Sequence, residues 1–177
     1  MYRDLYNKGN LFFDKGDFHS AIDAYKQALS YNPNHTSSKM NIGLCYCEIG
    51  ELNIGENWLR ECLTINPKDD KALHNLGRCL ERQEKLEEGQ IYFKKALEVN
   101  PHYQTARMGL GSNYFKLGLS EQGERELLKL IEYGKEASAY FGLAYEFYEC
   151  RNIPKAQYYR DKYFEIRPEK RGKTLTN

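Results

Sequence analysis

Residues 73–101 read LHNLGRCLERQEKLEEGQIYFKKALEVNP, and this stretch decides the fold because its pattern recurs along the chain. A glycine column and a proline column return at a spacing of 34 residues: Gly9, Gly43, Gly77 and Gly111, and Pro33, Pro67 and Pro101. Self-similarity at a fixed period indicates tandem structural repeats. The register divides the chain into five repeats at about 2–35, 36–69, 70–103, 104–136 and 137–170.

Each repeat is predicted to form two helices. In the first repeat, apolar residues follow helical spacing on both sides of the pair Gly16-Asp17, and Pro33 ends the second helix because proline cannot continue it. The third repeat has Gln83-Glu84 at the turn and the fifth has Arg151-Asn152. Small residues are expected where the two helices cross, since they let the backbones approach closely: Ala21, Gly55, Gly89, Gly123 and Ala156.

The third repeat carries the pattern L-G-x2-L, then G-x3-F, A and P, and this resembles the tetratricopeptide repeat. The fourth repeat departs from that pattern by lacking the proline, and the fifth by having Arg160 at the aromatic position. The resemblance implies an all-α, right-handed α-solenoid of five helix-turn-helix repeats. It implies a single domain over residues 2–170, a concave groove lined by the first helix of each repeat, and protein binding without chemistry. Residues 171–177 form a short basic tail.

Composition and charge argue against nucleic-acid binding, membrane association and secretion. With 26 Lys plus Arg against 25 Asp plus Glu, the net charge is 26 − 25 = +1, so no whole-molecule field would attract nucleic acid or a membrane surface. No apolar run approaches the roughly 18–20 residues of a membrane span, and the N-terminus does not resemble a signal peptide. Five cysteines, an odd number, favour reduced thiols. We therefore expect a cytoplasmic protein.

One asparagine occupies the same position in three successive repeats: Asn7, Asn41 and Asn75. This position is expected to face the groove, where a carboxamide could pair with the main chain of an extended peptide. The ladder is similar to the one in the tetratricopeptide domain of O-linked N-acetylglucosamine transferase, and it stops at Gly109 and Gly142. The alternative is that these asparagines are solvated and idle.

A second set of positions resembles the carboxylate clamp of tetratricopeptide co-chaperones that bind the tails of Hsp70 or Hsp90. The equivalent positions are Tyr6, Asn10, Asn41, Lys71 and Asn75. Three of the five match, but Tyr6 and Asn75 replace two of the three cations, which weakens charge-assisted bonding to a carboxylate. Arg78 could restore a positive charge, or it could pair with neighbouring acids.

The remaining groove positions predict a basic middle and an aromatic C-terminal part. They are Arg3, Phe13, Met40, Leu44, Cys47, His74, Arg78, Arg82, Met108, Ser112, Phe115, Lys116, Phe141, Tyr145, Tyr148 and Glu149. Aromatic residues, Met and Arg anchor protein interfaces, so the expected ligand is a segment with an acidic stretch and bulky apolar residues. Alternatively, Phe141 and Tyr145 pack against neighbouring helices.

The last helix raises the question of what covers it. Solenoids need a polar cap on their last repeat, yet Tyr158, Tyr159, Tyr163 and Phe164 are followed only by the basic tail. A homodimer through the uncapped C-terminal repeat, or a partner protein, would cover this face.

No motif predicts catalysis, a cofactor or a metal site, because the four histidines lack an i, i+4 pair and no phosphate loop appears. Cys45, Cys62 and Cys79 are expected to be buried as small hydrophobic residues. We therefore expect an adaptor or scaffold and not an enzyme. The alternative is an assembly or secretion chaperone that shields an apolar segment. Nucleic-acid binding is disfavoured because Asp14, Glu48 and Glu149 occupy groove positions.

Overall fold

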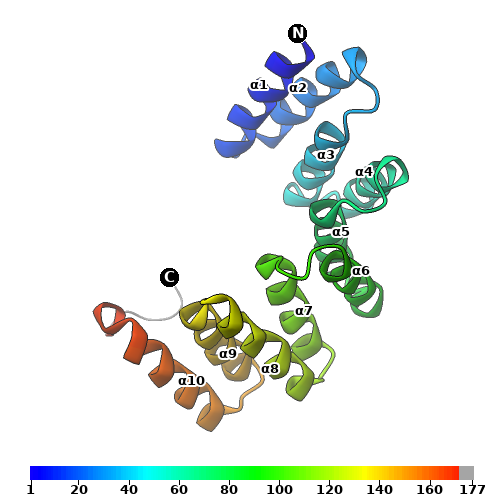
Figure 1. The fold of residues 1–177 in the computed structure, drawn as a ribbon. Coiled ribbons are helices and arrows are strands. Elements are labelled where there is room, and N and C mark those ends of the chain that lie inside the picture. Colours follow the sequence, from blue (N-terminus) through cyan, green and yellow to red (C-terminus); the bar gives the residue numbers. More distant parts are fainter. Residues whose placement is uncertain (172–177) are drawn as a thin grey trace. The chain divides into compact units, whose positions relative to one another are not determined.

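The computed structural model describes residues 1–171 of the 177-residue chain (Figure 1). Over this range the chain forms helices in tandem and contains no strand, which confirms the predicted all-α class. The α-helices are α1 Tyr2–Asp14, α2 Phe18–Tyr31, α3 Thr36–Glu48, α4 Leu52–Ile65, α5 Asp70–Arg82, α6 Leu86–Val99, α7 Gln104–Lys116, α8 Ser120–Leu128, α9 Glu136–Glu149 and α10 Ile153–Ile166.

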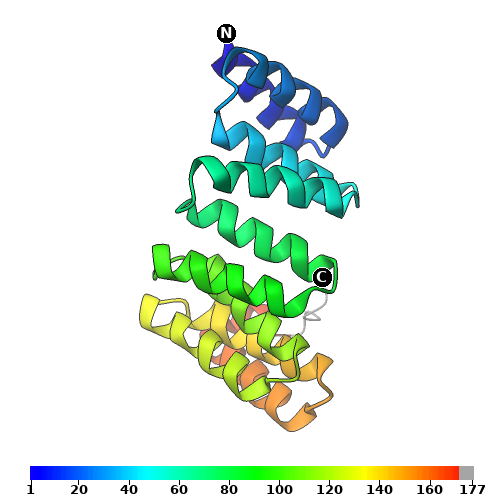
Figure 2. The same cartoon turned by 90° about the vertical axis from the view of Figure 1, so that its right-hand side faces the viewer.

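The helices pack as consecutive antiparallel pairs, and the chain divides into two compact units. The first unit, Met1–Pro101, holds α1/α2, α3/α4 and α5/α6, and the second unit begins at His102 and holds α7/α8 and α9/α10. Within the first unit, α2 also packs on α3 and α4 on α5, so the three hairpins form successive layers (Figure 2).

The hairpins begin where the repeat register placed them, to within one residue. A single domain over residues 2–170 stays a prediction. The predicted basic tail lies outside the described residues from position 172 onward.

The turn within each hairpin contains one residue in the left-handed conformation. In three hairpins it is a glycine, Gly16, Gly50 or Gly118, with φ of 76°, 91° and 76°. In the other two it is Glu84, with φ 61°, and Arg151, with φ 57°. Left-handed geometry costs a side-chain-bearing residue roughly 1–2 kcal/mol. Packing of the two helices therefore imposes this turn even where glycine is missing.

The close helix crossing predicted from the small-residue columns is present. A Cβ atom built on Gly55 of α4 would lie 2.8 Å from the carbonyl oxygen of Gly43 in α3 and 2.5 Å from Sγ of Cys47. Both distances are too short for a carbon atom, so only glycine allows this approach of α3 and α4.

The fourth hairpin departs from the others where its proline is missing. Its second helix α8 ends at Leu128 and continues as a 3₁₀ turn, η1 Lys129–Tyr133. Gly134 then ends it in the left-handed conformation, with φ 67°. Glycine thus replaces the Asn-Pro stop of the first three repeats. In the fifth hairpin, Asn152 caps α10 by accepting from the Lys155 amide.

The first hairpin has a polar outer surface. Lys8 is exposed, whereas the equivalent residues of the next two hairpins, Ile42 and Leu76, are fully buried against the preceding hairpin. Likewise, Asp4 is exposed where Ala72 is buried. Charged side chains at these positions therefore leave this face of the first hairpin solvated.

Candidate functional site

We call the side chains at five equivalent positions of α1, α3 and α5 the first-helix face of the first unit. They are Arg3, Tyr6, Asn7, Asn10 and Asp14 on α1, Ser37, Met40, Asn41, Leu44 and Glu48 on α3, and Lys71, His74, Asn75, Arg78 and Arg82 on α5. Side-chain contacts join the three helices. Asn41 donates to Asn10 at 3.2 Å, and Glu48 lies 3.8 Å from Arg82. The predicted positions therefore form one connected surface within this unit.

A closed hydrogen-bond network fixes the first two helices of this face. The hydroxyl of Tyr25, from α2, donates to Oδ1 of Asn10 at 2.8 Å. The Asn41 amide donates to that same Oδ1 at 3.2 Å and to the Tyr25 oxygen at 3.1 Å. Burial raises the pKa of Tyr25 above its usual value, so the phenol stays neutral and can donate. These groups therefore fix α1 and α3 in place.

The network and the burial of Asn75 correct the expectation of three open carboxamides. Asn7 is exposed, Asn41 is half-buried and hydrogen-bonded within the protein, and Asn75 is 9% exposed. Sequence reasoning missed this, although the chain offers a signal. Tyr25 occupies a column whose next members, Leu59 and Phe93, are apolar and fully buried, and a buried hydroxyl in such a column calls for a polar partner.

His74 is also buried instead of lining an open face, because its ring packs on the same hairpin. It is 3% exposed, and its ring centroid lies 5.8 Å from that of Phe93. Burial, assisted by the charge of Arg78, lowers the pKa of His74 to about 4. The imidazole is therefore neutral at physiological pH and adds no charge to the first-helix face.

The charged groups of the face give it a positive surplus. Four cations, Arg3, Lys71, Arg78 and Arg82, stand against the carboxylates of Asp14 and Glu48, which gives 4 − 2 = +2. Glu48 lies between two of these cations, 3.9 Å from Arg78 and 3.8 Å from Arg82. Arg78 is thus shared with a neighbouring acid, as the alternative interpretation of this residue required. Lys71 is exposed, and among residues 1–171 no ion pair engages it.

The positions that resemble the carboxylate clamp come together only in part. Lys71 is the single cation among them. Asn10 and Asn41 are bonded to each other, Asn75 is buried, and Tyr6 packs edge-on against His35 at a centroid distance of 5.0 Å. A carboxylate at this place would meet one ammonium group and few unused amides.

The second unit carries exposed apolar side chains on its first helices α7 and α9. Met108 is 39% exposed, Phe141 37% and Tyr145 46%. Phe141 also packs on Tyr163 of α10 at a centroid distance of 5.6 Å, as the packing alternative for this residue predicted. We refer to these three exposed side chains as the α7/α9 patch.

Phe115 and Cys47, both expected in the groove, are buried instead, at 4% exposure each. The ring of Phe115 meets that of Phe147 edge-on at 5.0 Å and fills the space left by Gly123. Cys47 packs over Gly55 in the same way. The small-residue column thus draws these side chains into their own hairpin. Cys45, Cys62 and Cys79 are buried, as predicted.

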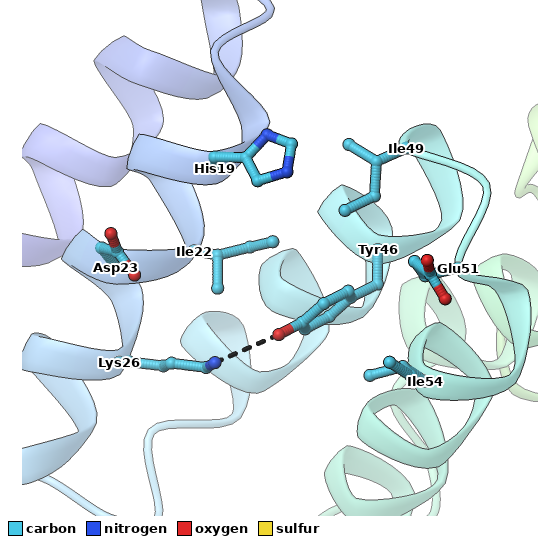
Figure 3. Close-up of a pocket in the computed structure, with 8 residues that line it drawn as sticks. All are labelled: His19, Ile22, Asp23, Lys26, Tyr46, Ile49, Glu51 and Ile54. Atoms are coloured by element: carbon cyan, nitrogen blue, oxygen red, sulfur yellow. Dashed lines mark hydrogen bonds between the residues drawn. The ribbon is translucent and has the colours of Figure 1, made fainter.

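A pocket that sequence reasoning missed lies beside the second helices (Figure 3). It has a volume of about 390 Å³ and is lined by His19, Ile22, Asp23 and Lys26 of α2, Tyr46 of α3, and Ile49, Glu51 and Ile54 around the following turn. Lys26 donates to the Tyr46 hydroxyl at 3.1 Å, closing one side. The available signal was Ile54, which is exposed in a column that otherwise holds Ser20 and Glu88.

The described part of the chain has neither a metal-binding cluster nor a helix that could span a membrane. Histidine, cysteine and acidic side chains nowhere gather in a set of three that could hold a metal ion. Within residues 1–171, every helix is too short or too polar to cross a bilayer.

Models of a known protein family match the first three repeats of this chain, each over the range of one repeat. Three family models described as the tetratricopeptide repeat match residues 2–35, 36–69 and 70–103, which together make up more than half of the chain. No curated protein matches the sequence.

Solved structures with a similar fold include MamA, YrrB and Spaghetti (RPAP3). MamA has a TM-score of 0.75 and 24% identity, over 92% of this chain and 95% of that one. YrrB, described as a tetratricopeptide repeat protein with an unusual peptide-binding site, has a TM-score of 0.69 and 19% identity, over 93% of this chain and 85% of that one. The first repeat domain of Spaghetti (RPAP3), bound to the HSP90 peptide SRMEEVD, has a TM-score of 0.63 and 24% identity, over 66% of this chain and 93% of that one. At these identities the likeness concerns the fold alone.

Proposed function

We propose that this chain, which belongs to the tetratricopeptide repeat family, is an adaptor that binds an extended or helical segment of a partner protein on the first-helix face. Proteins of this family are typically interaction scaffolds without catalytic activity. We accordingly expect no enzyme activity and no cofactor. We also expect a cytoplasmic location.

The observation that carries the proposal is the positive surplus of the first-helix face beside half-buried apolar groups. Lys71 is exposed and has no carboxylate partner among the described residues, and Arg78 and Arg82 share a single acid. Met40 and Leu44 on the neighbouring helix are half-buried. A partner segment with acidic residues next to a bulky apolar residue would satisfy both features.

Asn10 and Asn41 support this proposal by ordering the binding surface, and not by offering free carboxamides to a peptide. Because Asn10 and Asn41 are tied to Tyr25, the backbones of α1 and α3 are held before any ligand arrives. A surface that is already ordered loses less entropy on binding. Asn7, which is exposed, remains the carboxamide available to a peptide main chain.

Two alternatives keep specific support. An assembly or secretion chaperone that shields an apolar segment is favoured by the α7/α9 patch of Met108, Phe141 and Tyr145. Binding of Hsp70 or Hsp90 tails is favoured by Lys71, and the acidic peptide in the Spaghetti complex shows that a similar fold takes such a ligand. Loss of two clamp cations weighs against the second alternative.

The test begins with selection of phage-displayed random peptides on the immobilised full chain. Selected peptides are then titrated by fluorescence anisotropy against the wild type, Lys71→Ala, and the matched control Lys95→Ala, whose lysine is exposed on the second helix α6. Lys71→Ala is expected to weaken binding by roughly tenfold, since a charge-assisted hydrogen bond contributes about 1.5 kcal/mol or more. Lys95→Ala should bind like the wild type.

Two outcomes would count against the adaptor proposal. Equal affinities of Lys71→Ala and the wild type would show that the peptide does not bind on the first-helix face. Selected peptides that are apolar and carry no acid, and whose binding is lost in Tyr145→Ala, would favour the chaperone alternative.

A homodimer through α10 is a separate proposal. Tyr148 and Tyr158 are 61% and 56% exposed, and α10 carries both signs of charge, with Arg160 and Lys162 near Asp161 and Glu165. Two antiparallel copies of α10 could pair these charges. Analytical ultracentrifugation of the wild type and Tyr158→Glu tests it, and a monomeric wild type at high concentration would exclude it.

A further inference from the structure

Two cysteine side chains meet between the second and third hairpins. Cys47 lies at the end of α3 and Cys79 in α5, and both belong to one buried cluster that also contains Leu59 and Leu76. Both sulfurs lie against the first turns of α4: Sγ of Cys79 is 3.3 Å from the carbonyl oxygen of Leu52, and Sγ of Cys47 covers Gly55. We propose that Cys47 and Cys79 are a redox modification site, which a two-electron oxidant such as hydrogen peroxide converts into a disulfide that links the two hairpins.

The surroundings hold the two sulfur atoms at this contact. The Cys79 thiol donates to the carbonyl oxygen of Leu52 at 3.3 Å, and Nε2 of Gln83 donates to Sγ of Cys79 at 3.6 Å. The sulfur of Cys47 lies over Gly55, whose missing side chain leaves room for it. Both sulfurs are thus fixed by neighbours other than each other. Such positioning matters because a disulfide forms only over a short range of separations.

The pairing is specific to this junction of the chain. At the preceding junction, the residues equivalent to Cys47 and Cys79 are Phe13 and Cys45, so only one thiol is present there. In the third hairpin, Glu81 replaces the residue equivalent to Cys47. The repeat register therefore brings two thiols together only between α3 and α5, among the first five helices.

The surroundings shift the pKa values of the two thiols in opposite directions. The hydrogen bond from Cys47, with help from Gln83, lowers the pKa of Cys79 below its usual value. The same hydrogen bond and burial raise the pKa of Cys47, which keeps its proton. Because the thiolate is the form that reacts with oxidants, Cys79 is the sulfur expected to react first, once it has lost the proton that it donates to the Leu52 carbonyl oxygen.

The chemistry balances in two steps. The Cys79 thiolate attacks one oxygen of hydrogen peroxide, the O–O bond breaks, and hydroxide leaves, so Cys79 becomes a sulfenic acid. The Cys47 sulfur then attacks the Cys79 sulfur. The S–S bond forms as the S–O bond breaks, and the sulfenic oxygen leaves as water with the Cys47 proton. The sulfurs lose two electrons in total, and one peroxide becomes two waters once hydroxide takes up a proton. Because Cys79 is 1% exposed, local opening is expected to limit the rate.

The test treats the full chain with hydrogen peroxide and then alkylates the remaining thiols under denaturing conditions. A Cys150→Ser background removes the exposed thiol that could link two molecules. Mass spectrometry is expected to show the loss of two alkylatable thiols and a linked peptide pair that contains Cys47 and Cys79, with both thiols restored by dithiothreitol. The oxidised protein should also melt roughly 5 °C higher, because the cross-link restricts the unfolded chain.

Single-cysteine variants separate this site from the other thiols. Cys47→Ser and Cys79→Ser should each abolish the linked pair, whereas Cys45→Ser, a buried thiol outside the contact, should retain it. The proposal is overturned if Cys47 and Cys79 remain fully alkylatable after peroxide treatment, or if the linked peptides contain other cysteines. The measurement on the Cys150→Ser background alone decides this, even if a variant at the pair does not fold. It is also independent of the proposed ligand.

Discussion

Replacing His74 by methionine should remove a large part of the dependence of stability on pH. Methionine is the natural choice because Met40 and Met108 occupy the same position in neighbouring repeats. His74 is 3% exposed and packs on Phe93. The variant keeps an apolar contact with Phe93 and removes the only group at this position that titrates.

The magnitude follows from the pKa difference between the folded and unfolded states. Burial lowers the pKa of His74 from 6.5 to about 4 in the folded state. The unfolded state therefore binds the proton first as pH falls, so stability is complete above about pH 6.5 and is lost progressively down to about pH 4. With roughly 1.4 kcal/mol for each pKa unit, this group alone accounts for a loss of about 3 kcal/mol across that window.

The assay is urea unfolding at a series of pH values between 7.5 and 4, followed by the fluorescence of Trp58, which is the single tryptophan and lies in the first unit. Other groups titrate in the same window, including His35, whose pKa burial also lowers. They are common to both proteins, so the difference between wild type and His74→Met isolates His74. If the two proteins lose stability in parallel from pH 6.5 to pH 4, the imidazole is not buried in its neutral form and the reasoning fails.

Three further substitutions test the packing. Tyr25→Phe removes the hydroxyl that joins Asn10 and Asn41 and should cost about 1–2 kcal/mol in chemical denaturation; an unchanged midpoint would show that the network contributes nothing. Glu84→Gly removes the strain of a side chain in the left-handed conformation and should stabilise the protein by about 0.5–1 kcal/mol. A lower melting temperature of the variant would contradict this. Gly55→Ala forces a Cβ against α3 and should destabilise by about 2 kcal/mol or more, and wild-type stability would mean that the crossing is looser than described.

The repeat register predicted the hairpins well because the residues that define it act on the backbone close to them in the sequence. Glycine at a turn, proline after a helix and a small residue at a crossing each act through the backbone of their own segment, so a spacing of 34 residues carries over into the start of each hairpin. Even the substitution of Glu84 for glycine left the turn unchanged, because the packing of α5 and α6 outweighs the cost of one left-handed residue.

The candidate site was harder to predict because exposure depends on neighbouring side chains. The register placed Asn41 on the groove side of its helix, but it could not tell that the hydroxyl of Tyr25 would reach between α1 and α3 and engage it. His74 was placed on the first-helix face, yet its ring turns onto Phe93. A column gives the direction of a Cα–Cβ bond, whereas burial is decided by the size and rotamer of the residues around it.

The central claim is that a partner segment lies on the first-helix face and not beside the second helices. It is tested most directly by placing a photoreactive amino acid at Asn7, which is exposed on α1, or at Asp23, which lines the pocket beside α2. After irradiation with a selected peptide, a cross-link from position 7 and none from position 23 is the predicted result. A cross-link from position 23 and none from position 7 would contradict the account.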